Sequence, residues 1–372
     1  MKMNLNMTPE KRRNTILSLL LIAAILGACA FLDANKYSYN YAISIIERSM
    51  IYAVVAVSMN LVNGFTGLFS LGQAGFMALG AYVTAILTIP VDQRASVYYI
   101  SGIHPAIANL HAPILVALVL GGLVAAAFAA LIGIPVLRLK SDYLAIATLG
   151  FAEIIRALIS APQLDTITNG SYGLKSIPGF SSLFQVLALT VVCIGLMVLL
   201  INSSFGRMFK AVREDEIAAE AMGINLFRHK QIAFVTSSFF AGIGGALLAM
   251  FQQSLQANAF KSSMTYEILL IVVIGGLGSI SGSVIASYLF IACSEWWLRF
   301  LDSEQMLFGV KLPLLRLGFR MVVFSAIIMV VVLFFRRGIM GTREVSVYDD
   351  VRAAGRFFRK LFGGKAAKGG AA

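Results

Sequence analysis

Charged residues are scarce in this sequence, and their scarcity defines the class of protein. Asp, Glu, Lys and Arg make up only 13% of the 372 residues, whereas 59% are apolar, and the mean hydropathy is +0.84. A soluble chain of this length needs far more charge to cover its surface. The apolar residues come in blocks of roughly 18–25, the length that crosses a bilayer core. The composition excludes a soluble globular protein and predicts one that spans a membrane.

Residues that carry covalent or metal chemistry are few as well. The three cysteines fall in apolar blocks without metal-ligand spacing, and the three histidines form no cluster with carboxylates. The phosphate-binding pattern G-x-x-x-x-G-K-[ST] is missing, which excludes ATP hydrolysis by the usual P-loop means. We expect a protein that is not an enzyme and that needs neither a metal nor a cofactor.

The excess positive charge lies in clusters beside the apolar segments, and these clusters predict which side of the membrane each link is on. The net charge is +12, and basic residues cluster at 11–13, 138–140, 207–230 and 336–368. Basic residues that flank spans mark the cytoplasmic side, and all four clusters fall on that side if the chain crosses the membrane an even number of times. Both termini are therefore predicted to be cytoplasmic. Nucleic-acid binding is not expected, because no basic stripe is interleaved with exposed aromatic residues.

Ten apolar segments can be drawn along the chain, and glycine-rich breaks at 63–67 and 275–282 interrupt two of them. The segments are 15–32, 43–63, 72–89, 113–137, 142–160, 184–202, 231–253, 264–279, 282–300 and 317–335. Irregular backbone at membrane depth is tolerated only where it is buried in protein or lines a cavity. The first segment could also be a signal peptide, but its length favours a retained helix.

These segments predict an all-α membrane protein with one large domain. We expect a polytopic helical bundle of about 8–10 transmembrane segments with Gly-rich broken helices, extending from residue 1 to 341. A basic tail over 342–372, rich in Gly, Ala and Lys towards its end, is predicted to be disordered and cytoplasmic. No polar link between segments is long enough to bury a core of its own.

The most informative stretch is 213–225, in the link 203–230 that is predicted to be cytoplasmic. Five basic and four acidic residues crowd into that link. The i,i+4 spacing within the stretch predicts a short helix that Gly223 ends, with a charged face and a small-residue face that fits a partner's groove. Single charge reversals at Glu214 or Asp215 are expected to do less than a β-branched residue at Gly223, because exposed ion pairs are typically worth about 0–1 kcal/mol.

Six blocks of the chain, taken in order, resemble the inner-membrane permeases of ABC importers for branched-chain amino acids, on the LivM-like side of the LivH/LivM pair. The blocks are GFTGLFSLGQAGF at 64–76, YLAIATLGFAEIIR at 143–156, TNGSYGL at 168–174, REDEIAAEAMGIN at 213–225, GGLGS at 275–279 and RRGIMG at 336–341. Together they cover the chain from about residue 60 to 341. The importer loop signature E-A-A-x-x-x-G is matched by Ala218, Ala219 and Gly223, while its acid stands one place early, at Glu216.

The resemblance implies a permease subunit of an importer for branched-chain or similar hydrophobic amino acids, located in the bacterial inner membrane. The partners it implies are a LivH-like second permease subunit, two LivG/LivF-like ATPase subunits, a periplasmic amino-acid-binding protein and membrane lipid. It assigns coupling to the ATPase to Arg213, Glu214, Asp215, Glu216, Ala218, Ala219, Glu220 and Gly223. Urea and short-amide permeases look similar. From another class, an ion-coupled secondary transporter could use Glu153 or Glu267, but it needs no docking loop.

The residues that line the translocation path are harder to assign. A zwitterionic substrate with an apolar side chain needs weak, transient contacts along its route, because tight binding would trap it. Ser70, Gln73, Thr148, Glu153 and Asn169 have suitable chemistry, although Ser and Thr within spans often serve helix packing. Glu153 stands three positions before Arg156 on a predicted helix, so these two are expected to form a mutually neutralising structural pair.

Overall fold

The computed structural model describes residues 26–100, 102–139, 141–297, 306–307, 310–311, 319–334, 338–341 and 344. The described residues within 40–342 belong to one compact unit, which carries the features discussed below. Most of the predicted first segment, 15–32, lies outside the described residues. The same is true of the predicted tail 342–372, apart from Glu344.

Four helices in the described part of the chain are long and apolar enough to cross a membrane. They are α2 (Lys36–Asn60) with its π-helical continuation η1 (Leu61–Phe65), α6 (Ile114–Val136), α9 (Leu183–Asn202) and α12 (Leu226–Gln252). Two bent pairs raise the number to six if each is one span: α3 (Gln73–Thr88) with α4 (Val91–Val97), bent by 120°, and α7 (Ser141–Ile159) with η2 (Pro162–Leu164) and α8 (Asp165–Thr168), bent by 55°. The all-α, polytopic class predicted from sequence is confirmed.

By length and composition, the described residues give fewer candidate spans than the 8–10 predicted from the sequence. The segments 264–279, 282–300 and 317–335 correspond to α13 (Ser262–Gly275), α14 (Ile280–Ile291) and α15 (Phe319–Phe334), each of fewer than 18 residues. At 1.5 Å per residue, the 14 residues of α13 extend only about 21 Å. The helix ends early because the chain turns at Gly276 and Gly278, both at positive φ, before α14 begins.

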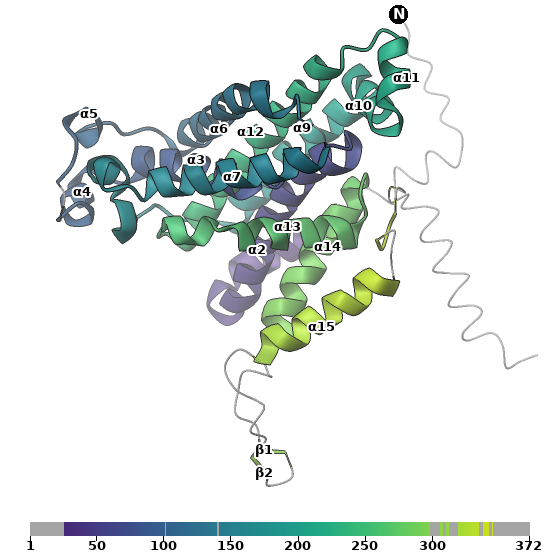
Figure 1. Cartoon of the computed structure of the whole chain (residues 1–372). Coiled ribbons are helices and arrows are strands. Elements are labelled where there is room, and N and C mark those ends of the chain that lie inside the picture. Colours follow the sequence, from purple (N-terminus) through teal and green to yellow (C-terminus); the bar gives the residue numbers. More distant parts are fainter. Residues whose placement is uncertain are drawn as a thin grey trace, which may run out of the picture. The chain divides into compact units, whose positions relative to one another are not determined.

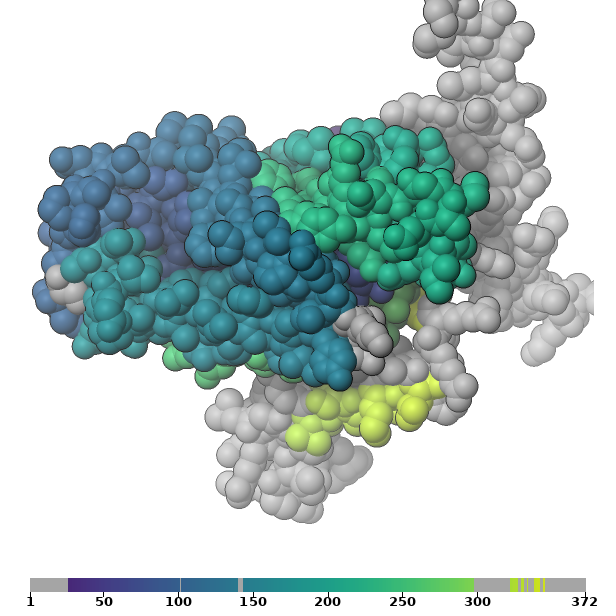
Figure 2. All heavy atoms as spheres, turned by 45° about the horizontal axis from the view of Figure 1, so that its top comes forward, coloured from purple at the N-terminus to yellow at the C-terminus, as the bar shows by residue number. Residues whose placement is uncertain are grey.

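The remaining described elements are short. They are α5 (Pro105–Ala108), η3 (Gly170–Tyr172), α10 (Ser204–Glu214), α11 (Glu216–Ala221), η4 (Ala257–Phe260), η5 (Ala292–Trp297) and the antiparallel strands β1 (Met306–Leu307) and β2 (Val310–Lys311). Figure 1 shows α4 and α5 at one end of the helical bundle and α10 and α11 at the other end. In Figure 2 these ends are the blue and the green surfaces. The short helices α4 and α5 therefore lie at the opposite end of the bundle from α10 and α11.

Glycines close the centre of the bundle. In the most apolar windows of α2 and α12, 72% and 78% of the residues are buried, against 33% and 28% in α6 and α9. A Cβ added to Gly80 of α3 would lie 2.1 Å from the carbonyl oxygen of Gly242 on α12, and one added to Gly245 would lie 2.0 Å from that of Met77. Small residues allow such backbone contact between membrane helices. Helices α2 and α12 therefore form the interior, while α6 and α9 face outward.

Candidate coupling site

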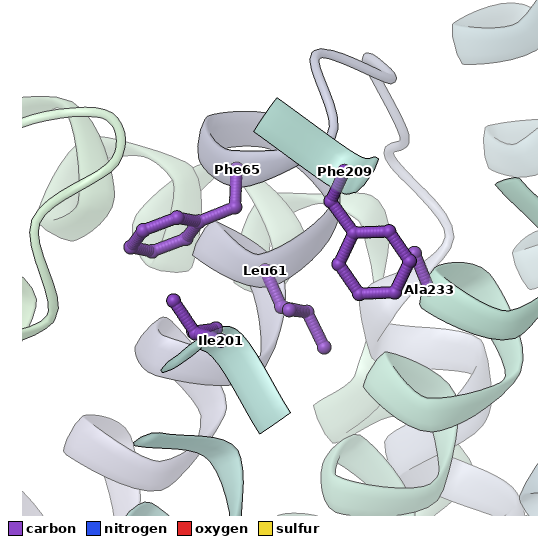
Figure 3. Close-up of a cluster of buried hydrophobic side chains, with 5 residues drawn as sticks. All are labelled: Leu61, Phe65, Ile201, Phe209 and Ala233. Carbon is purple, nitrogen blue, oxygen red and sulfur yellow. The ribbon is translucent and has the colours of Figure 1, made fainter. Parts of the chain in front are cut away.

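Helix α10 is anchored to the bundle by one apolar face. Its buried residues are Gly206, Phe209 and Val212, spaced three apart so that they share a face. The Phe209 side chain is fully buried against Leu61, Phe65, Ile201 and Ala233, which come from α2–η1, α9 and α12. Figure 3 shows the Phe209 ring pointing into this cluster. The anchor holds α10 beside the place where α2 becomes a π-helix.

Helix α11 is short, but both of its ends are capped. The Asp215 carboxylate accepts hydrogen bonds from the backbone N–H groups of Ile217 (2.8 Å) and Ala218 (3.0 Å), as an N-cap residue does. The predicted short helix ended by Gly223 is therefore confirmed. A capping role for Asp215 was not predicted from the sequence, and its carboxylate satisfies two N–H groups that the helix otherwise leaves without partners.

The C-terminal cap of α11 requires a residue at positive φ. The N–H of Ile224 bonds to the carbonyl of Ala219 (3.1 Å), and the N–H of Gly223 bonds to that of Glu220 (2.9 Å). This pair of bonds is the Schellman motif, in which the residue after the C-cap takes a left-handed conformation. Gly223 has φ +85°, and a Cβ added there would meet no atom within 4 Å. Backbone conformation, rather than space, therefore explains the glycine.

The outer surface of α11 is apolar at two positions that sequence reasoning did not single out. Ile217 and Met222 are 82% and 83% exposed. Ala219 is buried against the chain itself, whereas Ala218 is exposed, so the two alanines lie on different faces. A signal was present in the sequence, since Ile217 and Met222 are large apolar residues among the charges of a water-facing link. Large exposed apolar side chains of this kind mark an interaction surface.

Charged residues of the link pair with one another around α11. Lys230, near the start of α12, bonds to the Glu216 carboxylate with an Nζ–Oε2 distance of 2.6 Å. Arg213 pairs with Glu214 (Nη2–Oε1 2.5 Å). Both glutamates are largely exposed, so each pair contributes little to stability. Glu220 is exposed.

Arg213 also connects the link to the interior of the bundle. Its Nη1 donates to the carbonyl of Gly64 (2.9 Å), in the π-helical end of α2. A Cβ added to Gly278 would lie 2.8 Å from the same Nη1. A Cβ added to Gly64 would lie 2.4 Å from the backbone nitrogen of Gly278. The two glycine-rich breaks predicted from sequence therefore meet in space, and Arg213 contacts both.

Asn60 bonds the two breaks together. Its Oδ1 accepts from the N–H of Gly278 (2.9 Å), and its Nδ2 donates to the carbonyl of Ser279 (2.9 Å), the hydroxyl of Ser283 (2.7 Å) and the carbonyl of Gly276 (3.3 Å). The amide is fully buried, so these bonds satisfy groups that would otherwise be costly to bury. Asn60 was not among the predicted site residues, because one Asn in an apolar block gives no sign of partners more than 200 positions away.

The predicted path residues are held inside the chain. Ser70, Gln73, Thr148 and Asn169 are all buried and bonded within the chain. The contacts are Ser70 N to Asn63 Oδ1 (3.1 Å), Gln73 Nε2 to Ser58 Oγ (2.6 Å), Leu71 N to Thr148 Oγ1 (2.9 Å) and Asn169 Nδ2 to Gly173 O (2.6 Å). Such bonds fix turns and helix contacts. A role for these four residues in translocation stays a prediction.

Glu153 has structural partners in two helices. One carboxylate oxygen accepts from Arg156 Nε (2.7 Å), and the other accepts from the hydroxyl (2.5 Å) and the N–H (3.2 Å) of Ser262. Ser262 is the first residue of α13, so Glu153 joins α7 to the start of α13. The expected ion pair with Arg156 is present, and a role of Glu153 in translocation stays a prediction.

A helical bundle with several candidate spans and two glycine-rich breaks in contact defines an all-α, polytopic membrane protein. The chain belongs to the family described as branched-chain amino acid transport system / permease component, whose model matches residues 41–333. No solved structure matches the chain.

Relatives named as transport permease proteins support this membership. The chain is 34% identical over 301 residues to the LivM high-affinity branched-chain amino acid transport system permease protein of Salmonella typhimurium, covering 72% of the chain and 66% of that relative. It is similarly 34% identical to LivM of Escherichia coli. The match to LivH of Salmonella typhimurium is weaker, at 22% identity, and covers 79% of the chain and 92% of LivH. The chain thus spans slightly less than two thirds of the LivM relatives.

Proposed function

We propose that the chain is the transmembrane permease subunit of an ABC importer that moves branched-chain or similar hydrophobic amino acids across the inner membrane. The observation that carries the proposal is the connection from α11 through Arg213 to Gly64, where the two glycine-rich breaks meet. The substrate class comes from the family description and from the names of the LivM relatives. The chain has no P-loop pattern of its own, so a separate ATPase subunit drives it.

In this proposal α11 is the element that enters a groove of the ATPase. Ile217 and Met222 provide the apolar contact, and Arg213, Glu214, Asp215, Glu216, Ala218, Ala219, Glu220 and Gly223 shape the helix and its surroundings. A shift of α11 is passed to α10 and from there to α2 by two contacts: the buried Phe209 ring and the hydrogen bond from Arg213 to Gly64. Packed elements transmit such movements because interiors resist compression.

The assembly around the chain follows from this role. A LivH-like second permease subunit completes the translocation path, two LivG/LivF-like ATPase subunits bind the cytoplasmic face, and a periplasmic amino-acid-binding protein delivers the substrate. The family contains LivM and LivH relatives as separately named proteins, which supports a pair of different permease chains. Because α10 and α11 face the ATPase, the link 203–230 is cytoplasmic, and both termini are on that side too.

Uptake into vesicles tests the proposal. The complex of this chain with its second permease, the ATPases and the binding protein is reconstituted, and radiolabelled leucine uptake is measured with and without ATP inside. We expect uptake only with ATP, and a loss of both uptake and ATPase retention in Ile217→Asp, while a Tyr266→Phe control keeps both. ATP-independent uptake by this chain alone would point to an ion-coupled transporter. A binding protein that binds urea but not leucine would point to an amide permease.

A further inference from the structure

The centre of the bundle is tightly packed, so a wall of the translocation path must lie on the surface of the chain. Helices α3 and α12 are in backbone contact through Gly80, Gly242 and Gly245, so no amino acid passes between them. A path wall must instead be a face that carries polar groups at membrane depth. Polar and ionisable residues within spans are costly unless they face a water-filled cavity or protein.

One such face lies on α2, α13 and η5. Arg48 of α2 forms an ion pair with Glu295 of η5 and lies over the ring of Tyr52, with its Cζ 5.5 Å from the ring centroid. Its guanidinium also interacts electrostatically with Glu267 of α13. The Arg48 and Glu295 side chains are each about one third exposed (31% and 30%), and Glu267 is exposed. The charges therefore reach the surface of the chain.

The depth of this cluster follows from helix geometry. Arg48 is 12 residues before Asn60, about 18 Å along the helix axis, and Glu267 is eight residues before Gly275, about 12 Å along α13. The side chain of Asn60 bonds to Gly276 (3.3 Å), so both measurements start from the same level. A hydrocarbon core is about 30 Å thick. Arg48 also lies inside the candidate span Lys36–Phe65, and the cluster is at least partly exposed, where lipid would not accommodate its charge.

The charges of the cluster match those of a free amino acid. One guanidinium and two carboxylates leave a net charge of −1, and Glu267 has no hydrogen bond assigned among the described residues. The Nε of Arg48 is buried and has no hydrogen-bond partner among the described residues. A zwitterionic substrate carries an ammonium group, which a carboxylate of the chain can bind, and a carboxylate group, which a guanidinium of the chain can bind. The cluster offers one group for each end of such a substrate.

We propose that Arg48, Glu267 and Glu295 form a subsite for the zwitterionic head of the transported amino acid, on a water-accessible wall of the translocation path. Arg48 receives the carboxylate and Glu267 the ammonium, while Glu295 holds the Arg48 side chain in position. Because all three groups reach the surface of the chain, the contacts stay weak enough for release. This inference rests on the proposed function, and it adds the place on the chain where the substrate is contacted.

Cysteine labelling tests whether the face is wet, and it needs no transport. Cys29, Cys193 and Cys293 are replaced by serine, Glu267→Cys is introduced in the full complex, and a charged, membrane-impermeant methanethiosulfonate is applied. We expect modification at Glu267→Cys and none at a matched Leu199→Cys, on the outward-facing helix α9. Absence of reaction at Glu267→Cys would overturn the subsite, because the face would then be covered by lipid or by the second permease.

Transport of leucine tests the chemistry. In the reconstituted complex, we expect Glu267→Gln and Arg48→Gln each to lower the maximal rate of ATP-driven leucine uptake about tenfold, the effect of one charge-assisted contact. Retention of the second permease, leucine capture by the binding protein and ATP hydrolysis stay unchanged, and Glu267→Asp recovers part of the rate. The Tyr266→Phe control, on the neighbouring exposed residue, transports as the wild type does.

The alternatives give different results. Loss of the second permease on purification of Glu267→Gln would make the cluster a contact between subunits, and unchanged uptake would make it a structural ion pair; either result overturns the subsite. Absence of ATP-driven leucine uptake by the wild-type complex would overturn the proposed function instead, while the labelling result would still decide whether the face is wet.

Discussion

Replacement of Gly223 by valine separates backbone strain from steric clash in the coupling link. Gly223 has φ +85°, and a Cβ there would meet no atom within 4 Å, so the added side chain collides with nothing in this chain. The cost arises because an L-residue in the left-handed region is disfavoured by about 1–2 kcal/mol, with a β-branched residue at the upper end. A stability difference of 1.4 kcal/mol corresponds to about a tenfold change in an equilibrium.

That cost acts on a helix with little stability of its own. Helix α11 has six residues, and the two bonds at its C-terminal end require Gly223 to keep its conformation. We expect Gly223→Val to reduce the population of the capped helix about tenfold, and to lower ATPase retention and ATP-driven uptake in proportion. Membrane insertion and capture of substrate by the binding protein stay normal, because neither depends on α11.

The matched control is Gly223→Asn. Asparagine adds a side chain of similar size but enters the left-handed region more readily than other residues, so it should keep most of the uptake. Both variants are measured for ATPase co-purification and for leucine uptake in vesicles. Full uptake with valine, or equal loss with asparagine and valine, would refute the reasoning from φ and reduce the link to a tether.

Three further predictions concern the cap at Asp215, the buried amide of Asn60 and the topology of the chain. Asp215→Ala removes the N-cap and should cost about 1 kcal/mol of α11 stability, so it should lower uptake more than Glu214→Lys does; equal effects would contradict the capping role. Asn60→Leu leaves the buried N–H of Gly278 without its hydrogen-bond acceptor, at about 1–3 kcal/mol, and should lower the thermal unfolding midpoint of the complex in detergent. An unchanged midpoint would mean that the two breaks are held by other contacts. Reporter fusions at residues 12 and 345 should both report a cytoplasmic location, and a periplasmic signal at 345 would contradict the predicted topology.

Local sequence patterns were enough to predict the class of the protein and its most local site. Blocks of 18–25 apolar residues predict spans because a bilayer core has a fixed thickness. The helix that Gly223 ends was predictable because caps and i,i+4 spacing act over one or two turns. The family resemblance rested on the same local blocks, and the family model confirms it.

Which residues are buried depends on how the helices pack against one another, and the sequence did not predict it. In a membrane helix both the lipid-facing and the buried sides are apolar, so no periodicity distinguishes them. Helices α6 and α9 are as hydrophobic as a core helix, yet only 33% and 28% of the residues in their most apolar windows are buried. For the same reason the burial of Ser70 and Thr148 was not evident.

Contacts between distant positions were also beyond the sequence. Asn60 meets Gly278 across 218 positions, and Arg48 meets Glu295 across 247. Nothing local marks these pairs, because each depends on how the whole bundle packs. The sequence predicted that the chain has two glycine-rich breaks and a charged link, and packing alone brought the three together at Arg213.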